Sequence, residues 1–141
     1  MITLIDTGPI VALIDPRDAW HEACRATVKS LRSELITTLP ILTEAIHLAG
    51  MRAGRRRAWR SQQAIFNMIR AGGFAIAPHS PEGLARAAEL MSKYQDRPLD
   101  FADASLVALA EAINTRVVFT LDSEFRFYRL HGRRSFEILP D

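Results

Sequence analysis

The sequence predicts an α/β fold in which a mainly parallel sheet carries helices on both faces. Short apolar segments, each long enough for one strand, alternate along the chain with longer segments of helical periodicity. Strands separated by helices are joined by right-handed crossovers, which place them parallel to one another in one sheet. No repeat, low-complexity tract or linker interrupts the 141 residues. Residues 1–141 are therefore expected to form one domain.

Five apolar segments are the expected strands of this sheet. They are residues 2–5, 35–37, 74–76, 117–119 and 136–139. Each is short and rich in Ile, Leu, Val or Phe, which is typical of strands buried in a parallel sheet.

The segments between them show the 3.6-residue period of amphipathic helices. Apolar or small side chains share one face in residues 20–31 and again in residues 84–94. Pro40 is expected near the start of a further helix and Gly50 near its end. Residues 99–113 are apolar around most of the helix circumference, which predicts a buried helix.

The composition restricts the class of protein. Hydrophobic residues make up 48% and charged residues 24% of the chain, which is typical of a folded domain. No apolar run approaches the ~20 residues needed to span a bilayer, and no secretory signal is visible at the N-terminus. The single cysteine, Cys24, excludes an internal disulfide, so a cytoplasmic location is expected.

Carboxylates from distant parts of the chain are predicted to meet at one edge of the sheet. Asp6 and Asp122 follow the first and fourth expected strands, and sites in such sheets form beyond the carboxyl ends of the strands. Glu44 lies near the start of the helix that follows the second strand, facing the same edge. Asp100 and Asp103 share one side of a helix near its N-terminus.

Each acid also has a structural explanation. Asp6 can form a turn, Glu44 can be a surface helix residue, and Asp122 can precede a short helix. Asp100 suits the N-cap of its helix. Asp103 is harder to explain structurally, because nearly every neighbour in "FADASLVALA" is apolar.

A cluster of these acids is expected to bind a cation, because the carboxylates would otherwise repel one another. Two carboxylates ~4 Å apart repel by ~4 kcal/mol at an effective dielectric constant of 20. Oxygen ligands suit Mg²⁺ or Mn²⁺, whereas zinc favours His and Cys. The four histidines show no ligand pairing, and His21 and His47 are expected to be packing or hydrogen-bonding residues. The chemistry indicated is metal-assisted phosphodiester hydrolysis, with Asp6 and Asp103 as the main protein ligands and Glu44 and Asp122 completing the pocket.

Taken together, four motifs resemble those of the PIN-domain nucleases, and most closely the VapC-type toxins of toxin–antitoxin pairs. The segments are "LIDTGPIVALID", "PILTEAIHL", "DASLVALAE" and "VVFTLDSEF". The resemblance implies catalytic roles for Asp6, Glu44, Asp103 and Asp122, with Asp100 as an additional acid and Thr7 as a metal or water contact. It also implies a sheet ordered 3-2-1-4-5, Mg²⁺- or Mn²⁺-dependent cleavage of single-stranded RNA, homodimers and a cognate antitoxin.

Arginines supply a second candidate surface. Sixteen of the 18 basic residues are Arg, and Arg52, Arg56 and Arg60 are predicted to share one helix face. Such a face could follow RNA phosphates, meet an acidic antitoxin, or be solvated without a partner.

Two rival functions remain open: an acid-site phosphatase, and a catalytically inactive PIN-like module that binds RNA or protein. Phosphatases of this kind carry a second acid two residues after their nucleophilic Asp, where this chain has Gly8. The retained acids argue against the inactive module.

Overall fold

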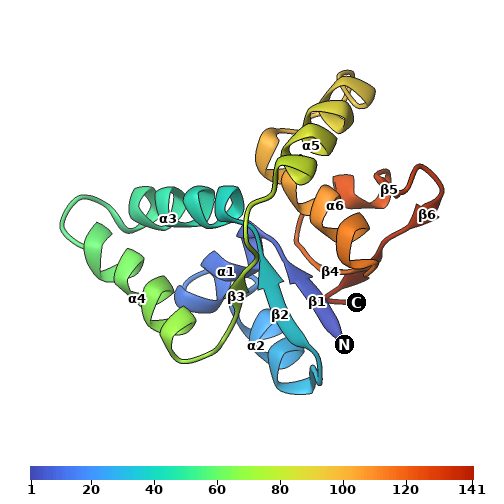
Figure 1. The fold of residues 1–141 in the computed structure, drawn as a ribbon. Coiled ribbons are helices and arrows are strands. Elements are labelled where there is room, and N and C mark those ends of the chain that lie inside the picture. The colour runs from blue at the N-terminus through green and yellow to red at the C-terminus, as the bar shows by residue number, and fades with distance from the viewer.

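Strand β1, Ile2–Ile5, lies at the centre of a five-stranded parallel sheet in a computed structural model that describes residues 1–141 (Figure 1). Strand β2 (Glu34–Thr37) pairs with one side of β1 and strand β4 (Val117–Phe119) with the other. Strands β3 (Ala75–Ile76) and β7 (Glu137–Leu139) form the two outer edges. Numbered among the sheet strands alone, the order is 3-2-1-4-5, so the predicted fold class and strand order are confirmed.

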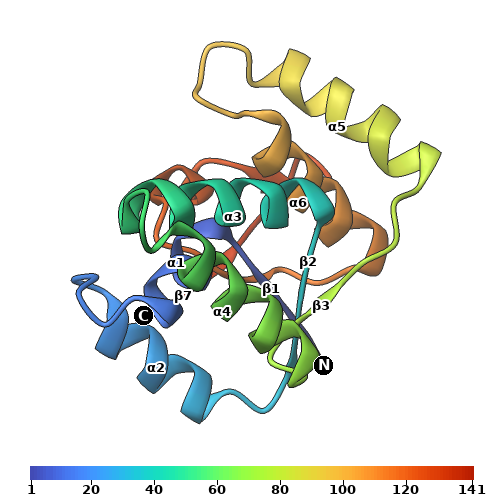
Figure 2. The ribbon, with the colours of Figure 1, turned by 90° about the vertical axis from the view of Figure 1, so that its left-hand side faces the viewer.

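Six helices surround the sheet. They are α1 (Thr7–Ile14), α2 (His21–Ser30), α3 (Leu39–Ala53), α4 (Ala58–Arg70), α5 (Pro81–Lys93) and α6 (Phe101–Ile113). In Figure 1, α1 to α4 lie to the left of and below the sheet, whereas α5 and α6 pack together to its upper right. Figure 2, turned by 90°, shows α3 crossing above β1 and β2. None of the helices is long and apolar enough to cross a membrane.

The register of the sheet places the ends of its inner strands side by side. Leu4 of β1 is opposite Ile36 of β2 and Val118 of β4. All three strands run in the same direction, so the residues that follow them lie along one carboxyl edge. Leu4 and Val118 are fully buried, which fixes this register because a one-residue slip would turn apolar side chains out of the core.

Beyond β4 the chain forms elements that the apolar pattern did not predict. A short 3₁₀ helix, η1 (Ser123–Arg126), is followed by an antiparallel pair, β5 (Arg129–Leu130) and β6 (Arg134–Ser135). Phe125 and Tyr128 are fully buried in this region. The segment is therefore part of the core and covers the side of the sheet where α6 lies.

Gly50 lies near the end of its helix, as predicted, but it is not the residue at which the helix ends. Helix α3 continues to Ala53 and ends at Gly54, whose φ of 79° few other residues adopt. Gly50 is buried within the helix, where an added Cβ would lie 2.5 Å from Nε2 of Gln62. Its lack of a side chain allows α4 to approach α3.

The prediction that Arg52, Arg56 and Arg60 share one face of one helix is wrong. Helix α3 ends at Ala53 and α4 begins at Ala58, so Arg52 belongs to α3, Arg60 belongs to α4, and Arg56 lies in the turn between them. Their sequence spacing is helical, but Gly54 interrupts the helix.

Candidate active site at the carboxyl edge of the sheet

Asp6 occupies the central position of the candidate site. It follows β1 and is the N-cap of α1, and its backbone N–H donates to the carbonyl of Phe119 at 2.9 Å. One carboxylate oxygen accepts from the backbone N–H of Thr7 at 2.8 Å, and the other accepts from the hydroxyl of Thr120 at 2.6 Å. The side chain is thus held by two strands and one helix, with only 5% of the residue exposed.

The pKa of Asp6 is raised from 3.8 to about 6, mainly by burial. The charges of Glu44 and Asp122 contribute to the rise, while the hydrogen bonds from Thr120 and Thr7 oppose it. Hydrogen bonds through Thr7 and Thr120 connect Glu44 and Asp122 to this position, so acids from three distant segments lie at one edge.

Glu44 is joined to the same place by Thr7. The Thr7 hydroxyl donates to one carboxylate oxygen of Glu44 at 2.6 Å, connecting the start of α1 to α3. Burial raises the pKa of Glu44, and the nearby Asp100 carboxyl adds to that rise. Thr7, the expected metal or water contact, orients Glu44 through its hydroxyl.

Asp100 and Asp103 form a capping box at the start of α6. The Asp103 N–H donates to the Asp100 carboxylate at 2.8 Å, and the Asp100 N–H donates back to Asp103 at 3.4 Å. Asp100 is exposed and Asp103 is 7% exposed. The expected capping role of Asp100 is present in the structure, and the buried acid of the pair is Asp103.

Asp103 has the most perturbed carboxylate of the site. Its pKa is raised from 3.8 to about 8, mainly by burial and also by the negative charges of Asp6 and Asp100. The influence of Asp6 on Asp103 connects the end of β1 to the start of α6. A carboxylate this strongly perturbed at a sheet edge is typical of a functional site.

Asp122 lies at the exposed rim. It is the N-cap of η1, accepting a hydrogen bond from the Glu124 N–H at 2.9 Å, and its own N–H donates to the Thr120 hydroxyl at 3.0 Å. Thr120 therefore connects Asp122 to Asp6, because its hydroxyl donates to one and accepts from the backbone of the other.

The acids share one edge without forming a closed cage. No three acidic, histidine or cysteine side chains are arranged to enclose a metal ion by themselves. Mg²⁺ is commonly held by one or two carboxylates and keeps several waters, so a pair such as Asp6 and Asp103 fits its chemistry. Burial, with a smaller contribution from neighbouring carboxylates, raises the pKa of both residues, and a bound cation would stabilise their charged forms.

Sequence reasoning missed Thr120 as a site residue. The residue was visible in "TLDSEF" as a polar side chain between an apolar strand and Asp122. Its hydrogen bond to Asp6 depends on the pairing of β1 with β4, which joins residues 114 positions apart. Only the strand order could have identified it.

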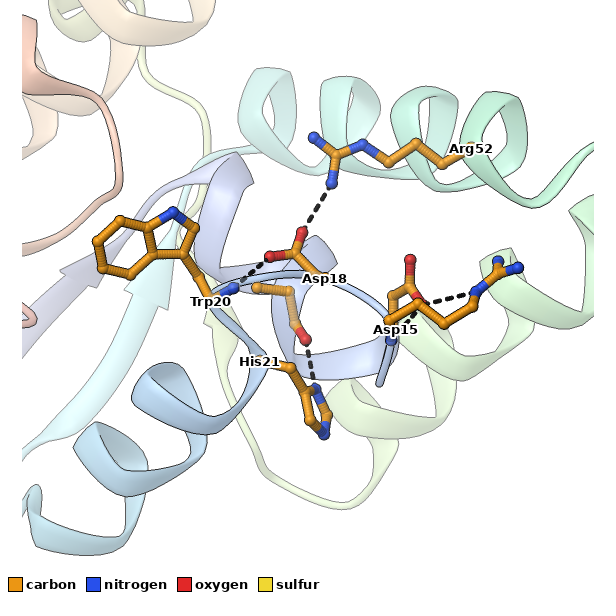
Figure 3. A network of polar contacts seen from close by, with 7 residues as sticks. Asp15, Asp18, Trp20, His21 and Arg52 are labelled. Atoms are coloured by element: carbon orange, nitrogen blue, oxygen red, sulfur yellow. Dashed lines mark hydrogen bonds and ion pairs between the residues drawn. The ribbon is translucent and has the colours of Figure 1, made fainter.

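The arginines predicted to bind RNA have separate surroundings. Figure 3 shows Arg52 reaching from α3 to Asp18 in the loop between α1 and α2, with Nη1 to Oδ2 at 2.8 Å. The other Asp18 oxygen accepts from the Trp20 N–H, and a ring nitrogen of His21 lies 2.6 Å from the Ala12 carbonyl oxygen. Arg52 thus fixes this loop, and His21 has the hydrogen-bonding role expected of it.

A cavity of about 250 Å³ lies where α1 ends and α4 begins. Its apolar lining includes Val11 and Ala49, and its arginines are Arg17, Arg52, Arg57 and Arg60. Arg56 is exposed in the turn outside this cavity. The basic surface is therefore built from three segments of the chain, with Arg57 as a member that the helical spacing did not predict.

A parallel sheet in this order with acids at its carboxyl edge defines a class of α/β nuclease-like domains, and comparison with known families agrees. Residues 3–130 match the family model described as PIN domain. The chain belongs to the PIN-domain family.

Among curated proteins, the chain is similar to Ribonuclease VapC26 of Mycobacterium tuberculosis. The two are 28% identical over 138 residues, which cover 97% of this chain and 99% of that protein. The chain is thus homologous to VapC ribonucleases, the toxins of VapBC toxin–antitoxin systems, as the four motifs predicted.

Solved structures show the same fold. Mycobacterium tuberculosis VapC20, described as a Sarcin-Ricin loop cleaving toxin, superposes with a TM-score of 0.77 at 21% identity, covering 95% of this chain and 99% of that one. VapBC-1 from nontypeable Haemophilus influenzae gives a TM-score of 0.62 at 20% identity, covering 88% and 89%. Several such relatives were crystallised as toxin–antitoxin complexes.

Proposed function

We propose that this chain is a metal-dependent endoribonuclease that cleaves single-stranded RNA and acts as the toxin of a toxin–antitoxin pair. The observation that carries the proposal is the pair Asp6 and Asp103, two buried carboxylates from distant segments of the chain, of which Asp6 raises the pKa of Asp103 through its charge. Structural carboxylates are normally paired with a base or hydrogen-bonded at the surface. These two carry no cationic partner among the ion pairs of the fold.

In the proposed site, Asp6 and Asp103 hold Mg²⁺ or Mn²⁺, and Glu44 and Asp122 complete the acidic pocket. The bound ion would activate a water and offset the charge of the scissile phosphate. Thr120 and Thr7 keep Asp6 and Glu44 in place through their hydroxyls. Asp122, at the exposed rim, is positioned to meet water or RNA entering from solvent.

The proposed partners are RNA, a protein antitoxin and a second copy of the chain. The relatives crystallised in complexes support the antitoxin. An apolar groove between α3, α5 and α6 supports the homodimer, since it is lined by Leu39, Leu84 and Phe101, each at least 42% exposed. Residues 1–141 would together form one PIN domain.

The first test is metal-dependent cleavage by the purified protein. Single-stranded RNA should be cut internally in Mg²⁺ or Mn²⁺, and EDTA should abolish the reaction until the metal is restored. A phosphomonoester such as p-nitrophenyl phosphate should remain intact. Hydrolysis of the monoester would favour the phosphatase, and RNA binding without cleavage would favour the inactive module. The variant Glu82→Gln, which changes an exposed acid of α5, is the matched control for loss of a negative charge.

A second expectation concerns Arg56 and Arg60, which we propose contact RNA phosphates. Both are exposed, and neither forms an ion pair within the fold, in contrast to Arg52. Each phosphate contact contributes ~0.7 to the log–log dependence of affinity on salt for single strands. Replacing both with Gln should reduce that slope by about 1.4 for any RNA sequence, leaving cleavage positions unchanged.

Binding isotherms across a salt series measure this slope. The control is Arg52→Gln, which removes the same charge but breaks the bond to Asp18, so it should lower the melting temperature with a smaller effect on the slope. An unchanged slope in the double variant would remove these two residues from the RNA surface. Pull-down of a candidate antitoxin with the same variant would then show whether they bind that protein.

A further inference from the structure

The basic cavity where α1 ends and α4 begins lies apart from the acidic edge. None of the acids of the candidate active site is in its lining. The cavity contacts α1 at Val11 and Ile14, whereas Asp6 caps the other end of that helix. At 1.5 Å per residue, the cavity is roughly 10 Å from Asp6 along α1. A group bound there would therefore be separate from one bound at the acidic edge.

Three helices each present one side to the cavity. Spacings of three or four residues place the lining positions of a helix on the same side. The lining includes Val11 and Ile14 of α1, Ala49 and Ala53 of α3, and Arg60 and Ala64 of α4. The alanines leave a volume of about 250 Å³, which is far more than one water requires. The space is sufficient for a hydrated phosphate group.

The carboxylates beside the cavity already have basic partners. Nη1 of Arg52 lies 2.8 Å from Oδ2 of Asp18 (Figure 3), and Nε of Arg17 lies 3.4 Å from Oδ1 of Asp15. Asp15 is the single acidic residue of the lining. No acidic side chain of the cavity therefore remains to neutralise further positive charge.

Arg57 and Arg60 supply that further charge. Both line the cavity from the start of α4, and neither forms an ion pair within the fold. Positive side chains are unfavourable at the start of a helix, and like charges three residues apart repel each other. The fold gains no stability from these two charges, whereas an anion in the cavity would be attracted by both.

We propose that this cavity binds one phosphate group, held by the guanidinium groups of Arg57 and Arg60. A guanidinium can donate two parallel hydrogen bonds to phosphate oxygens, which suits arginine to this ligand. The RNA backbone supplies that phosphate, at a nucleotide away from the cleaved bond, and this part of the inference rests on the proposed function. A free phosphate compound has the same chemistry, so the experiment has one arm for each source.

The first arm titrates inorganic phosphate into the protein in EDTA at constant ionic strength. EDTA prevents a metal ion from carrying phosphate to the acidic edge. Phosphate should raise the melting temperature of the wild type above its value in chloride, because it binds the folded state. Arg57→Gln should weaken phosphate binding by about tenfold in calorimetry, because it removes charged hydrogen bonds. In chloride, this variant should melt at the wild-type temperature or higher, because an unfavourable charge is lost.

Arg55→Gln is the matched control. Arg55 is exposed in the same turn, forms no ion pair and lies outside the cavity. The two variants remove the same charge from positions two residues apart. Arg55→Gln should therefore bind phosphate with wild-type affinity.

The second arm measures binding of single-stranded RNA in EDTA across a salt series. If the RNA backbone occupies the cavity, Arg57→Gln should lower the log–log salt slope by ~0.7, and inorganic phosphate should compete with RNA. The slope of Arg55→Gln should match that of the wild type. Phosphate binding that depends on Arg57, together with an unchanged RNA slope, would assign the cavity to a free phosphate compound and overturn the RNA part of the inference.

Equal phosphate affinity in the wild type and Arg57→Gln would overturn the phosphate site itself. A lower melting temperature of Arg57→Gln in chloride, with unchanged phosphate affinity, would overturn it as well and assign Arg57 to the fold. A protein that binds phosphate through Arg57 but cleaves no RNA with Mg²⁺ or Mn²⁺ would contradict the proposed function and support the phosphate site. The two failures are therefore distinguishable.

Discussion

Asparagine at either Asp6 or Asp103 is expected to abolish RNA cleavage, lowering the rate by at least about a hundredfold, whereas Asp100→Asn retains most activity. The expectation follows from burial and charge. Asp6 and Asp103 are buried acids of which the first raises the pKa of the second, and loss of a direct metal ligand should exceed the 10–100-fold typical of its outer partners. Asp100 is exposed and its oxygen caps α6, a role that an asparagine oxygen can also perform.

This prediction is tested by the initial rates of the three variants on one RNA, with their melting temperatures measured in parallel. All three variants should remain folded, so loss of activity in two of them cannot be attributed to unfolding. If Asp100→Asn is as inactive as Asp103→Asn at the same melting temperature, Asp100 belongs to the metal site. Undiminished Mg²⁺-dependent cleavage by Asp6→Asn would overturn the whole assignment.

The stability of the metal-free protein should fall as the pH rises from about 4 to above 8. The folded-state pKa values of Asp6 and Asp103 lie near 6 and 8, above the ordinary value of 3.8. Such groups bind protons more tightly in the folded state than in the unfolded state. Below pH 3.8 they therefore do not destabilise the protein, and once the pH exceeds their folded-state pKa their full destabilising effect is present. At about 1.4 kcal/mol per unit, Asp6 alone accounts for a loss of about 3 kcal/mol.

Thermal melts at several pH values, with EDTA or with Mn²⁺, measure this effect. Mn²⁺ should reverse the decline at pH 8, because an ion that binds only the folded state stabilises it. Asp6→Asn and Asp103→Asn should each flatten the metal-free curve and melt higher than the wild type at pH 8. A metal-free protein whose stability rises between pH 5 and pH 8 would contradict the raised pKa values. The two contributions are not additive, because the groups interact.

The sheet was predictable because its strands are short, apolar and separated by helices. All five predicted strands form within one residue of the expected positions, and their order is the one that the resemblance to PIN-domain nucleases implied. The residue that ends α3 could not be identified from the sequence, because one glycine resembles another there. Gly50 and Gly54 both follow an apolar helical pattern, and only tertiary packing shows that Gln62 lies against the first and a positive φ ends the helix at the second.

The acids were predictable because strand ends and helix starts at one edge can be identified from the chain alone. The structure does bring Asp6, Glu44, Asp103 and Asp122 to that edge, while their chemical roles stay predictions. The role of Thr120 in holding Asp6 was not predictable. Thr120 acts across a strand pair, so its role depends on a contact between distant residues.

The order of the strands has a consequence for synthesis on the ribosome. Asp6 leaves the ribosome about a hundred positions before its partners Asp103 and Thr120. Strand β4 joins the sheet more than a hundred residues after β1, and β7 joins it later still. Pairings between such distant segments form late in folding. At ~5–20 residues per second, several seconds of translation pass before the acids can meet, so a nascent or truncated chain lacks the assembled site.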